Sequence, residues 1–282
     1  MRTWLCLLTA IALAACGGKK DPPATGSGTG SGSPTPAAPT GIEVFVNDTS
    51  VVKISPDQIT SWPRLDSLLP EDAQRLGTWQ VVYITGADPK PAELNNPSSS
   101  YPQMVPALFP GEGNLPAFGM FDPIELMKHG KPGLRQDRVR EIRIKMSKDG
   151  RGGDHQGGAA STDPSKLVLT IKTDDGDKQL TGTQILALPV ETMPGNDDNK
   201  GWKLTKLLAA AGAPAKYAQL VLTDAAGANL VISKKDFDDT TMIPFVKLNR
   251  QGSLRFRMMK KQGEGWNATS DLRALTSVKV VK

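Results

Sequence analysis

The chain has 282 residues, a formal net charge of +5 at pH 7 and 38% hydrophobic residues. So small a charge for this length does not favour nucleic acid as a partner. Its two cysteines, Cys6 and Cys16, both lie near the N-terminus. The remainder of the sequence therefore offers no disulfide, no thiolate metal ligand and no cysteine nucleophile.

The N-terminus has the layout of an export signal. Arg2 precedes an apolar run at residues 4–13, which is shorter than the roughly 20 apolar residues of a membrane-spanning helix. The motif LAAC at residues 13–16 resembles the lipobox of bacterial lipoprotein precursors. This resemblance implies that the thiol of Cys16 is acylated and anchors the protein through its acyl chains. The alternative is an ordinary signal peptide with an incidental cysteine.

The residues after Cys16 predict a tether and a location. The residue after Cys16 is Gly17 and not an aspartate, and in this respect the chain resembles lipoproteins that are sorted to the outer membrane. We therefore expect a lipid-anchored protein of the cell envelope, at the outer membrane, with the membrane as one partner. Residues 17–40 are mostly Gly, Ser, Thr, Pro and Ala, so they cannot bury enough apolar surface to fold and are predicted to be a disordered tether.

Five blocks of similar residues recur in the same order after the tether, which predicts a tandem duplication. The aligned blocks are Ser55–Ile59 with Thr181–Ile185, Arg64–Leu69 with Lys203–Leu208, Gln80–Tyr83 with Gln219–Leu222, Met104–Pro106 with Met242–Pro244, and Val139–Ile144 with Leu275–Val280. The predicted organisation is a signal peptide (1–16), the tether (17–40), a first module (41–148), a Gly-rich polar linker (149–164) and a second module (165–282).

Each module is predicted to be an α+β unit in which strands outnumber short helices. The predicted order is an opening strand (42–46 or 167–171), a short helix with leucines on one face (Leu65, Leu68, Leu69 or Leu204, Leu207, Leu208), a strand (80–85 or 219–223) and a closing strand (139–146 or 275–280). Pro70 ends the first helix, and Gly212 with Pro214 ends the second. A Pro-rich loop is expected before each closing strand.

The second module resembles the molybdopterin-binding domain of sulfite-oxidase-type oxidoreductases. The first matching motif is a helix of that family, carried here by Gly201, Leu204, Leu207, Leu208, Ala211 and Gly212. The second is a pterin-lining segment, matched more loosely by Asn249, Gly252, Leu254 and Arg255. The resemblance covers most of the second module and reaches the first through the repeat.

The sequence departs from that family at the metal. Catalytic members ligate molybdenum through a Cys thiolate, a soft ligand, and no cysteine exists between Gly17 and Lys282. The resemblance therefore implies a degenerate scaffold with no cofactor and a non-catalytic binding or assembly role, with an envelope protein as a possible partner. One alternative is an oxidoreductase that binds molybdopterin without the Cys ligand. Another is a structural spacer of the outer envelope.

Two groups of residues are candidates for a site. The candidate ligand-lining residues are Gly201, Trp202, Asn249, Arg255 and Arg257. Arg255 and Arg257 flank Phe256, which is also the pattern of a plain edge strand. The candidate partner loop lies in the Pro-rich segment 95–121 and carries Tyr101, Phe109, Phe118 and Phe121, which alternatively fill the core of the first module.

Other polar clusters favour structural roles. His129 and His155 lie in polar loops without ligand spacing, so we expect no zinc site and no Ser-His-Asp triad. The acidic runs 174–177 and 196–199 lack the spacing of a calcium loop, and the first predicts a hairpin turn. The basic residues of segment 135–148 alternate with apolar ones and predict the solvated side of a half-buried strand.

Overall fold

The computed structural model describes residues 41–147 and 163–282, and these residues lie in one compact unit. The predicted signal peptide, Cys16, the tether and nearly all of the predicted linker, with His155, lie outside the described residues. We call residues 41–147 the first half and residues 163–282 the second half.

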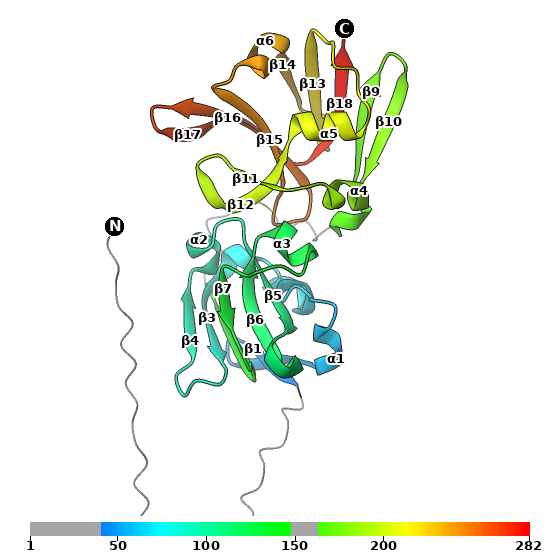
Figure 1. The fold of residues 1–282 in the computed structure, drawn as a ribbon. Coiled ribbons are helices and arrows are strands. Elements are labelled where there is room, and N and C mark those ends of the chain that lie inside the picture. The colour runs from blue at the N-terminus through cyan, green and yellow to red at the C-terminus, as the bar shows by residue number, and fades with distance from the viewer. Residues whose placement is uncertain (1–40, 148–162) are drawn as a thin grey trace, which may run out of the picture. The chain divides into compact units, whose positions relative to one another are not determined.

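The first half contains a five-stranded sheet with apolar residues on one face. Its strands, in spatial order, are β2 (Thr49–Ile54), β1 (Ile42–Val46), β8 (Glu141–Met146), β3 (Trp79–Thr85) and β4 (Ala92–Asn95), and β1, β3 and β4 are labelled in Figure 1. Strands β1 and β8 pair in parallel, and the other neighbours are antiparallel. Buried residues alternate with more exposed ones along β8, where Ile142 and Ile144 point to the core.

A second, three-stranded sheet completes the first half. It consists of β5 (Val105–Pro110), β6 (Pro116–Phe121) and β7 (Leu134–Gln136). The helices are α1 (Pro56–Ile59), α2 (Pro97–Ser100) and α3 (Pro123–Met127), and the 3₁₀ turns are η1 (Asp66–Leu68), η2 (Glu71–Ala73), η3 (Leu76–Thr78) and η4 (Glu112–Asn114). Because each helix is so short, packing of the strands carries most of the fold.

The second half also contains a five-stranded sheet. Its spatial order is β10 (Gly176–Thr181), β9 (Val168–Thr173), β18 (Leu275–Val281), β13 (Gln219–Asp224) and β14 (Asn229–Ser233). Here β9 and β18 pair in parallel, and the other neighbours are antiparallel. The turn predicted at residues 174–177 is confirmed, since it joins β9 to β10.

The remaining sheet of the second half carries most of the candidate ligand-lining residues. Its strands are β11 (Glu191–Met193), β12 (Asn196–Lys203), β15 (Met242–Leu248), β16 (Leu254–Gln262) and β17 (Gly265–Leu272). The helices of this half are α4 (Gly182–Ala187), α5 (Leu204–Ala210) and α6 (Lys234–Asp238), and the 3₁₀ turn is η5 (Pro164–Lys166). This strand-rich mixture confirms the predicted α+β class.

Three predicted elements differ from the structure. In the second half, the segment before the closing strand is not the predicted Pro-rich loop, since it forms α6 and the strands β15, β16 and β17. The other two differences lie in the first half. The helix predicted around Leu65–Leu69 is a single 3₁₀ turn, η1. Only six residues lie between Pro63 and Pro70, which is too short to offset the cost of helix nucleation. Its counterpart in the second half is a helix as predicted, α5.

The Pro-rich segment 95–121 is not the predicted loop, because it contains α2 and the antiparallel pair β5–β6. Proline donates no hydrogen bond to a ladder and is tolerated on edge strands. Strand β5 is at the edge of its sheet, and the carbonyl of Pro106 accepts a hydrogen bond from Leu65. The prolines are therefore compatible with a strand at this position.

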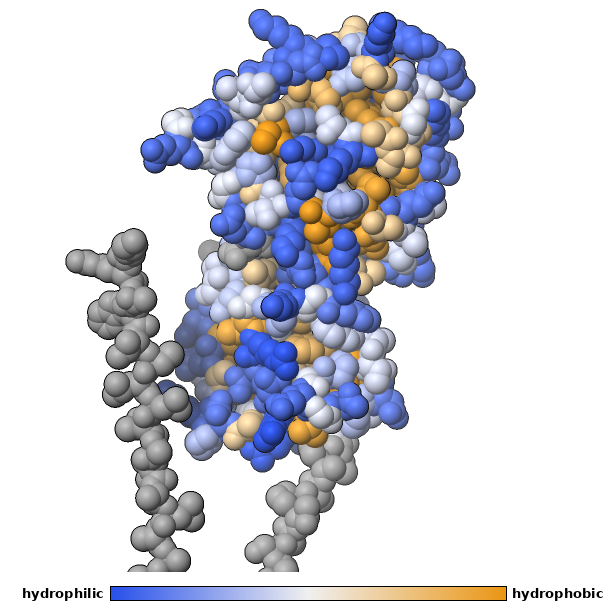
Figure 2. Space-filling view, in the orientation of Figure 1, coloured by the Kyte–Doolittle hydropathy of each residue, from blue (hydrophilic) through white to orange (hydrophobic). Residues whose placement is uncertain are grey.

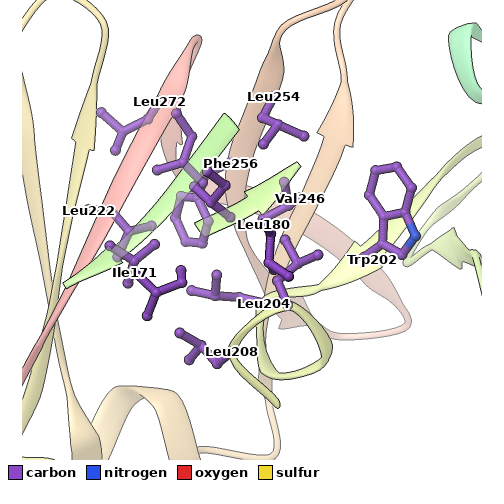
Figure 3. Packing of buried hydrophobic residues seen from close by; sticks show 14 of the residues in the cluster. Ile171, Leu180, Trp202, Leu204, Leu208, Leu222, Val246, Leu254, Phe256 and Leu272 are labelled. Atoms are coloured by element: carbon purple, nitrogen blue, oxygen red, sulfur yellow. The ribbon is translucent and has the colours of Figure 1, made fainter. Parts of the chain in front are cut away.

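Each half has a large apolar cluster. The cluster of the second half gathers side chains from both of its sheets and from α5, and Figure 3 shows Phe256 among leucines of this cluster. One residue of the first half, Ile124 of α3, is fully buried in that same cluster. Hydrophilic residues cover much of the visible face, with hydrophobic patches on both halves (Figure 2). Over residues 41–147 and 163–282, the structure contains no helix of the length and hydropathy needed to span a bilayer.

Candidate functional site

The sheet β11-β12-β15-β16-β17 has one face in the apolar core, and its other face carries charged side chains beside the buried Phe245. Val246 of β15 pairs with Phe256 of β16, and both are fully buried in the core. Lys247 pairs with Arg255, and Asp271 of β17 pairs with Arg257. Because neighbouring residues along a strand point to opposite faces, Lys247, Arg255, Arg257 and Asp271 share the face opposite the core. We call these four residues the charged face.

Gly201 and Trp202, two of the predicted ligand-lining residues, serve packing. Trp202 is 0% exposed and belongs to the apolar core, where its indole Nε1 donates to the carbonyl of Leu188 over 3.4 Å. Gly201 lies so close to β15 that an added Cβ would be 2.3 Å from the carbonyl oxygen of Val246. Neither residue presents a side chain to a ligand.

Asn249 stabilises the turn between β15 and β16. Its side-chain Nδ2 donates to the carbonyl of Arg273 over 3.0 Å, and its Oδ1 accepts from the backbone N–H of Ser253 over 2.9 Å. Gly252 in the same turn has a φ of 82°, a conformation that glycine adopts without strain. The amide of Asn249 is thus already engaged with the backbone of its own chain.

Arg255 is buried against a carboxylate. Its Nε donates to Asp271 Oδ1 over 2.8 Å, its Nη2 donates to Asp271 Oδ2, and its Nη1 is 3.4 Å from Gln103 Oε1 of the first half. Burial raises the pKa of Asp271, but the hydrogen bonds from Arg255 and the charges of Arg257 and Arg273 hold it below its ordinary value. This bidentate pair occupies the fork of Arg255.

Arg257 is held more loosely than Arg255. Its Nε is 4.0 Å from Asp271 Oδ1, and its side chain is 24% exposed. No acceptor among residues 41–147 and 163–282 lies within hydrogen-bond distance of this buried Nε. Burial and the neighbouring Arg255 lower the pKa of the guanidinium.

Lys247 is a functional candidate that the sequence did not reveal. The residue is 1% exposed, and its Nζ donates to Asn199 Oδ1. Burial lowers the pKa of Lys247 to about 7; Asp122 opposes this shift, while Arg257, Arg255 and Arg250 add to it. The only signal in the sequence was that Lys247 lies two residues after Phe245 in an apolar segment, so both side chains would share one face of a strand. Nothing in the sequence indicated that the lysine is buried.

Asp122 approaches Lys247 from the first half. The carboxylate caps α3 by accepting from the N–H of Ile124 over 2.9 Å, and it accepts from the N–H of Lys200 over 3.3 Å. Its exposed fraction is 6%, and burial raises its pKa. One side chain therefore fixes the start of α3 and contacts the second half.

Further polar contacts join the two halves around Ile124. Glu125 pairs with Lys200 over 2.6 Å. Arg250 donates to the carbonyl oxygens of Ser98 and Tyr101 over 2.7 and 2.8 Å, and its own carbonyl accepts from Arg64. We call this set of contacts, together with Asp122 and Ile124, the joint.

The candidate partner loop does not form an exposed aromatic surface. Phe109, Phe118 and Phe121 are 3%, 0% and 0% exposed, and Tyr101 is partly buried against the core of the first half. The expectation of docking aromatics is thus corrected. Phe118 packs in the main core of the first half, and Phe109 and Phe121 pack in a separate apolar cluster with Leu126. His129, which is exposed, stacks on Trp62 with ring centroids 4.6 Å apart.

Neither a metal-binding group nor a related protein is found. No cluster of three or more His, Cys, Asp or Glu side chains with metal-binding geometry occurs in the described part of the chain. Comparison of the chain with protein-family models, curated proteins and solved structures gives no match in any of the three. The functional argument therefore rests on the sequence motifs and on the geometry of the charged face.

Proposed function

We propose that this chain is a lipid-anchored envelope lipoprotein with a non-catalytic binding or assembly role. The observation that carries the proposal is the engagement of the candidate ligand-lining residues inside the protein. Arg255 is paired with Asp271, Asn249 is bonded within its turn, and Trp202 is in the core. These contacts support binding over cofactor chemistry, as does the lack of cysteine after Cys16.

We also propose that the body arose by tandem duplication. Support comes from the five aligned sequence blocks and from the pairing of the two five-stranded sheets. In each sheet the opening and closing strands, β1 with β8 or β9 with β18, are parallel neighbours, and an antiparallel hairpin flanks either side. The aligned segments 104–106 and 242–244 both lead into or lie in strands, β5 and β15.

The resemblance to sulfite-oxidase-type domains belongs to the same proposal. The motif residues Leu204, Leu207 and Leu208 lie on one buried face of α5, which suits a scaffold role. The segment likened to a pterin-lining stretch is the β15–β16 turn, where Arg255 contacts Asp271 and Gln103. The carboxylate of Asp271 and the side-chain amide of Gln103 thus accept from the Arg255 guanidinium, which would otherwise be available to a cofactor.

The deciding experiment is mass spectrometry with metal analysis on the full chain, purified natively by lipid-preserving extraction from a bacterial host. We expect an acylated N-terminus at Cys16 with neither molybdenum nor pterin. The Cys16→Ser variant should lose both the acyl mass and the membrane fraction. Co-purified molybdenum or pterin would overturn the non-catalytic proposal and favour a cofactor-binding oxidoreductase, whereas an unmodified Cys16 would overturn the anchor.

A further inference from the structure

We propose that Arg257, supported by Lys247 and Arg255, forms a binding site for a small oxyanion such as phosphate or sulfate. This inference rests on the proposed binding function and names the chemistry of its ligand. The site lies on the charged face and includes Arg257, one of the candidate ligand-lining residues.

The first argument is the unequal sharing of Asp271. Both oxygens of this carboxylate accept from Arg255, at 2.8 Å for the Nε–Oδ1 pair. Arg257 lies two residues further along β16 on the same face, and its Nε approaches Asp271 Oδ1 only to 4.0 Å. Burying a guanidinium charge is costly, and an oxyanion that accepts from the accessible part of this side chain, which is 24% exposed, would offset that cost.

The second argument is the balance of charge. The cations Lys247, Arg255 and Arg257 are close enough to affect one another, and the carboxylates acting on them are Asp122 and Asp271. Arg250 also acts on Lys247, so the cations outnumber the two carboxylates, one of which has a raised pKa because it is buried. Positive potential in a poorly solvated site attracts small anions.

The third argument is access. Lys247 and Arg255 are 1% and 7% exposed, whereas the side chain of Arg257 is 24% exposed. A ligand would therefore contact Arg257 directly, while Lys247 and Arg255 contribute through their fields. The small exposed fraction favours a compact anion over an extended acidic peptide.

A pH dependence follows from the groups that face Lys247. These are Asp122 at the start of α3, Asn199 of β12, Arg250 in the β15–β16 turn, and Arg255 and Arg257 of β16. The pKa of Lys247 is lowered to about 7, so the amine gains its proton as the pH falls through that value. Sulfate, whose charge does not change over this range, should therefore bind more tightly at about pH 6 than at about pH 8, and this difference should shrink in Lys247→Met.

The test is calorimetric titration of the full chain, solubilised in detergent, with sodium phosphate against sodium chloride at equal ionic strength. We expect saturable binding of phosphate that is weakened about tenfold or more in Arg257→Gln. The matched control is Arg135→Gln, which also removes one arginine charge but from an exposed pair with Asp137. Arg257→Lys keeps the charge without the fork and should bind with intermediate affinity.

Two further results matter: one distinguishes a lipid head group from free phosphate as the ligand, and the other would overturn the site. Flotation of the unacylated Cys16→Ser chain with phosphatidylglycerol vesicles separates a lipid head group from free phosphate: binding that is lost when Arg257→Gln is added but kept when Arg135→Gln is added assigns the head group. Absence of saturable phosphate binding, or equal binding by wild type, Arg257→Gln and Arg257→Lys, would overturn the site. In that case acylation of Cys16 and absence of pterin would leave the proposed function standing.

Discussion

At the scale of single residues, Lys247 and Asp122 have the largest consequences. The amine of Lys247 is buried on β15, its hydrogen-bond acceptor is the neutral amide of Asn199, and the opposing carboxylate of Asp122 comes from the other half. Desolvation disfavours the charged form of each, so the pKa of Lys247 is lowered and that of Asp122 is raised. Both shifts make the stability of the fold depend on pH.

The first prediction concerns this dependence. The pKa of Lys247 is about 7 in the folded protein, against 10.5 for an ordinary lysine. Between these values the unfolded chain binds more protons than the folded one, so the free energy of unfolding should rise with pH, by at most about 1.4 kcal/mol per pH unit. Urea unfolding at about pH 7, 8.5 and 10 measures the slope.

The comparison for this prediction is Lys247→Met, which keeps a long side chain without the amine. Its free energy of unfolding should vary less with pH over the same window. The carboxyl of Asp122 acts in the opposite direction at lower pH: because its folded pKa is raised above 3.8, its contribution to stability is lost as the pH rises through that range. Equal slopes for wild type and Lys247→Met would refute the assignment.

At the scale of elements, the close approach of β12 to β15 fixes the register of the sheet. Trp202 pairs with Val246 and enters the core, while Gly201 lies beneath the carbonyl of Val246. A side chain at position 201 would force the two strands apart. Strand packing therefore explains why residue 201, at the start of the motif that continues into α5, is a glycine, and no contact with a ligand is needed to explain it.

The second prediction tests that explanation. Gly201→Ala should destabilise the protein by about 1–3 kcal/mol, because its Cβ would overlap both Val246 O and Phe245 Cε1, which lie 2.3 and 2.6 Å from that position. The control is Gly265→Ala in β17, where the nearest atom is 3.7 Å away. Thermal unfolding of both variants measures the difference. A loss in Gly265→Ala as large as that in Gly201→Ala would count against the packing argument.

At the scale of the whole molecule, the joint makes the two halves one folding unit. Ile124 is a side chain of the first half that is buried in the core of the second. Asp122, Glu125 and Arg250 also make hydrogen bonds and an ion pair between the two halves. Apolar burial and satisfied polar groups together couple the halves.

The third prediction is a loss of cooperativity when this coupling is cut. Ile124→Ala should lower the free energy of unfolding by about 2–5 kcal/mol and separate the transitions of the two halves. Ile59→Ala is the matched control, since Ile59 is also buried but lies in the core of the first half alone. Calorimetry of the full chain should give two resolved transitions for Ile124→Ala only. A single transition in both variants would show that the joint does not couple the halves through Ile124.

The sequence by itself determined the α+β class, the strands predicted at 42–46, 219–223 and 275–280, and α5, because these depend on local periodicity and turn residues. The sequence also shows that the chain after Cys16 contains no thiol. Only the tertiary structure decided that the Pro-rich segment forms β5 and β6 and that its phenylalanines are buried. It alone paired Arg255 with Asp271 and brought Asp122 towards Lys247. The physical reason is that burial, strand register and ion pairing join residues far apart in the chain, and no local pattern records these contacts.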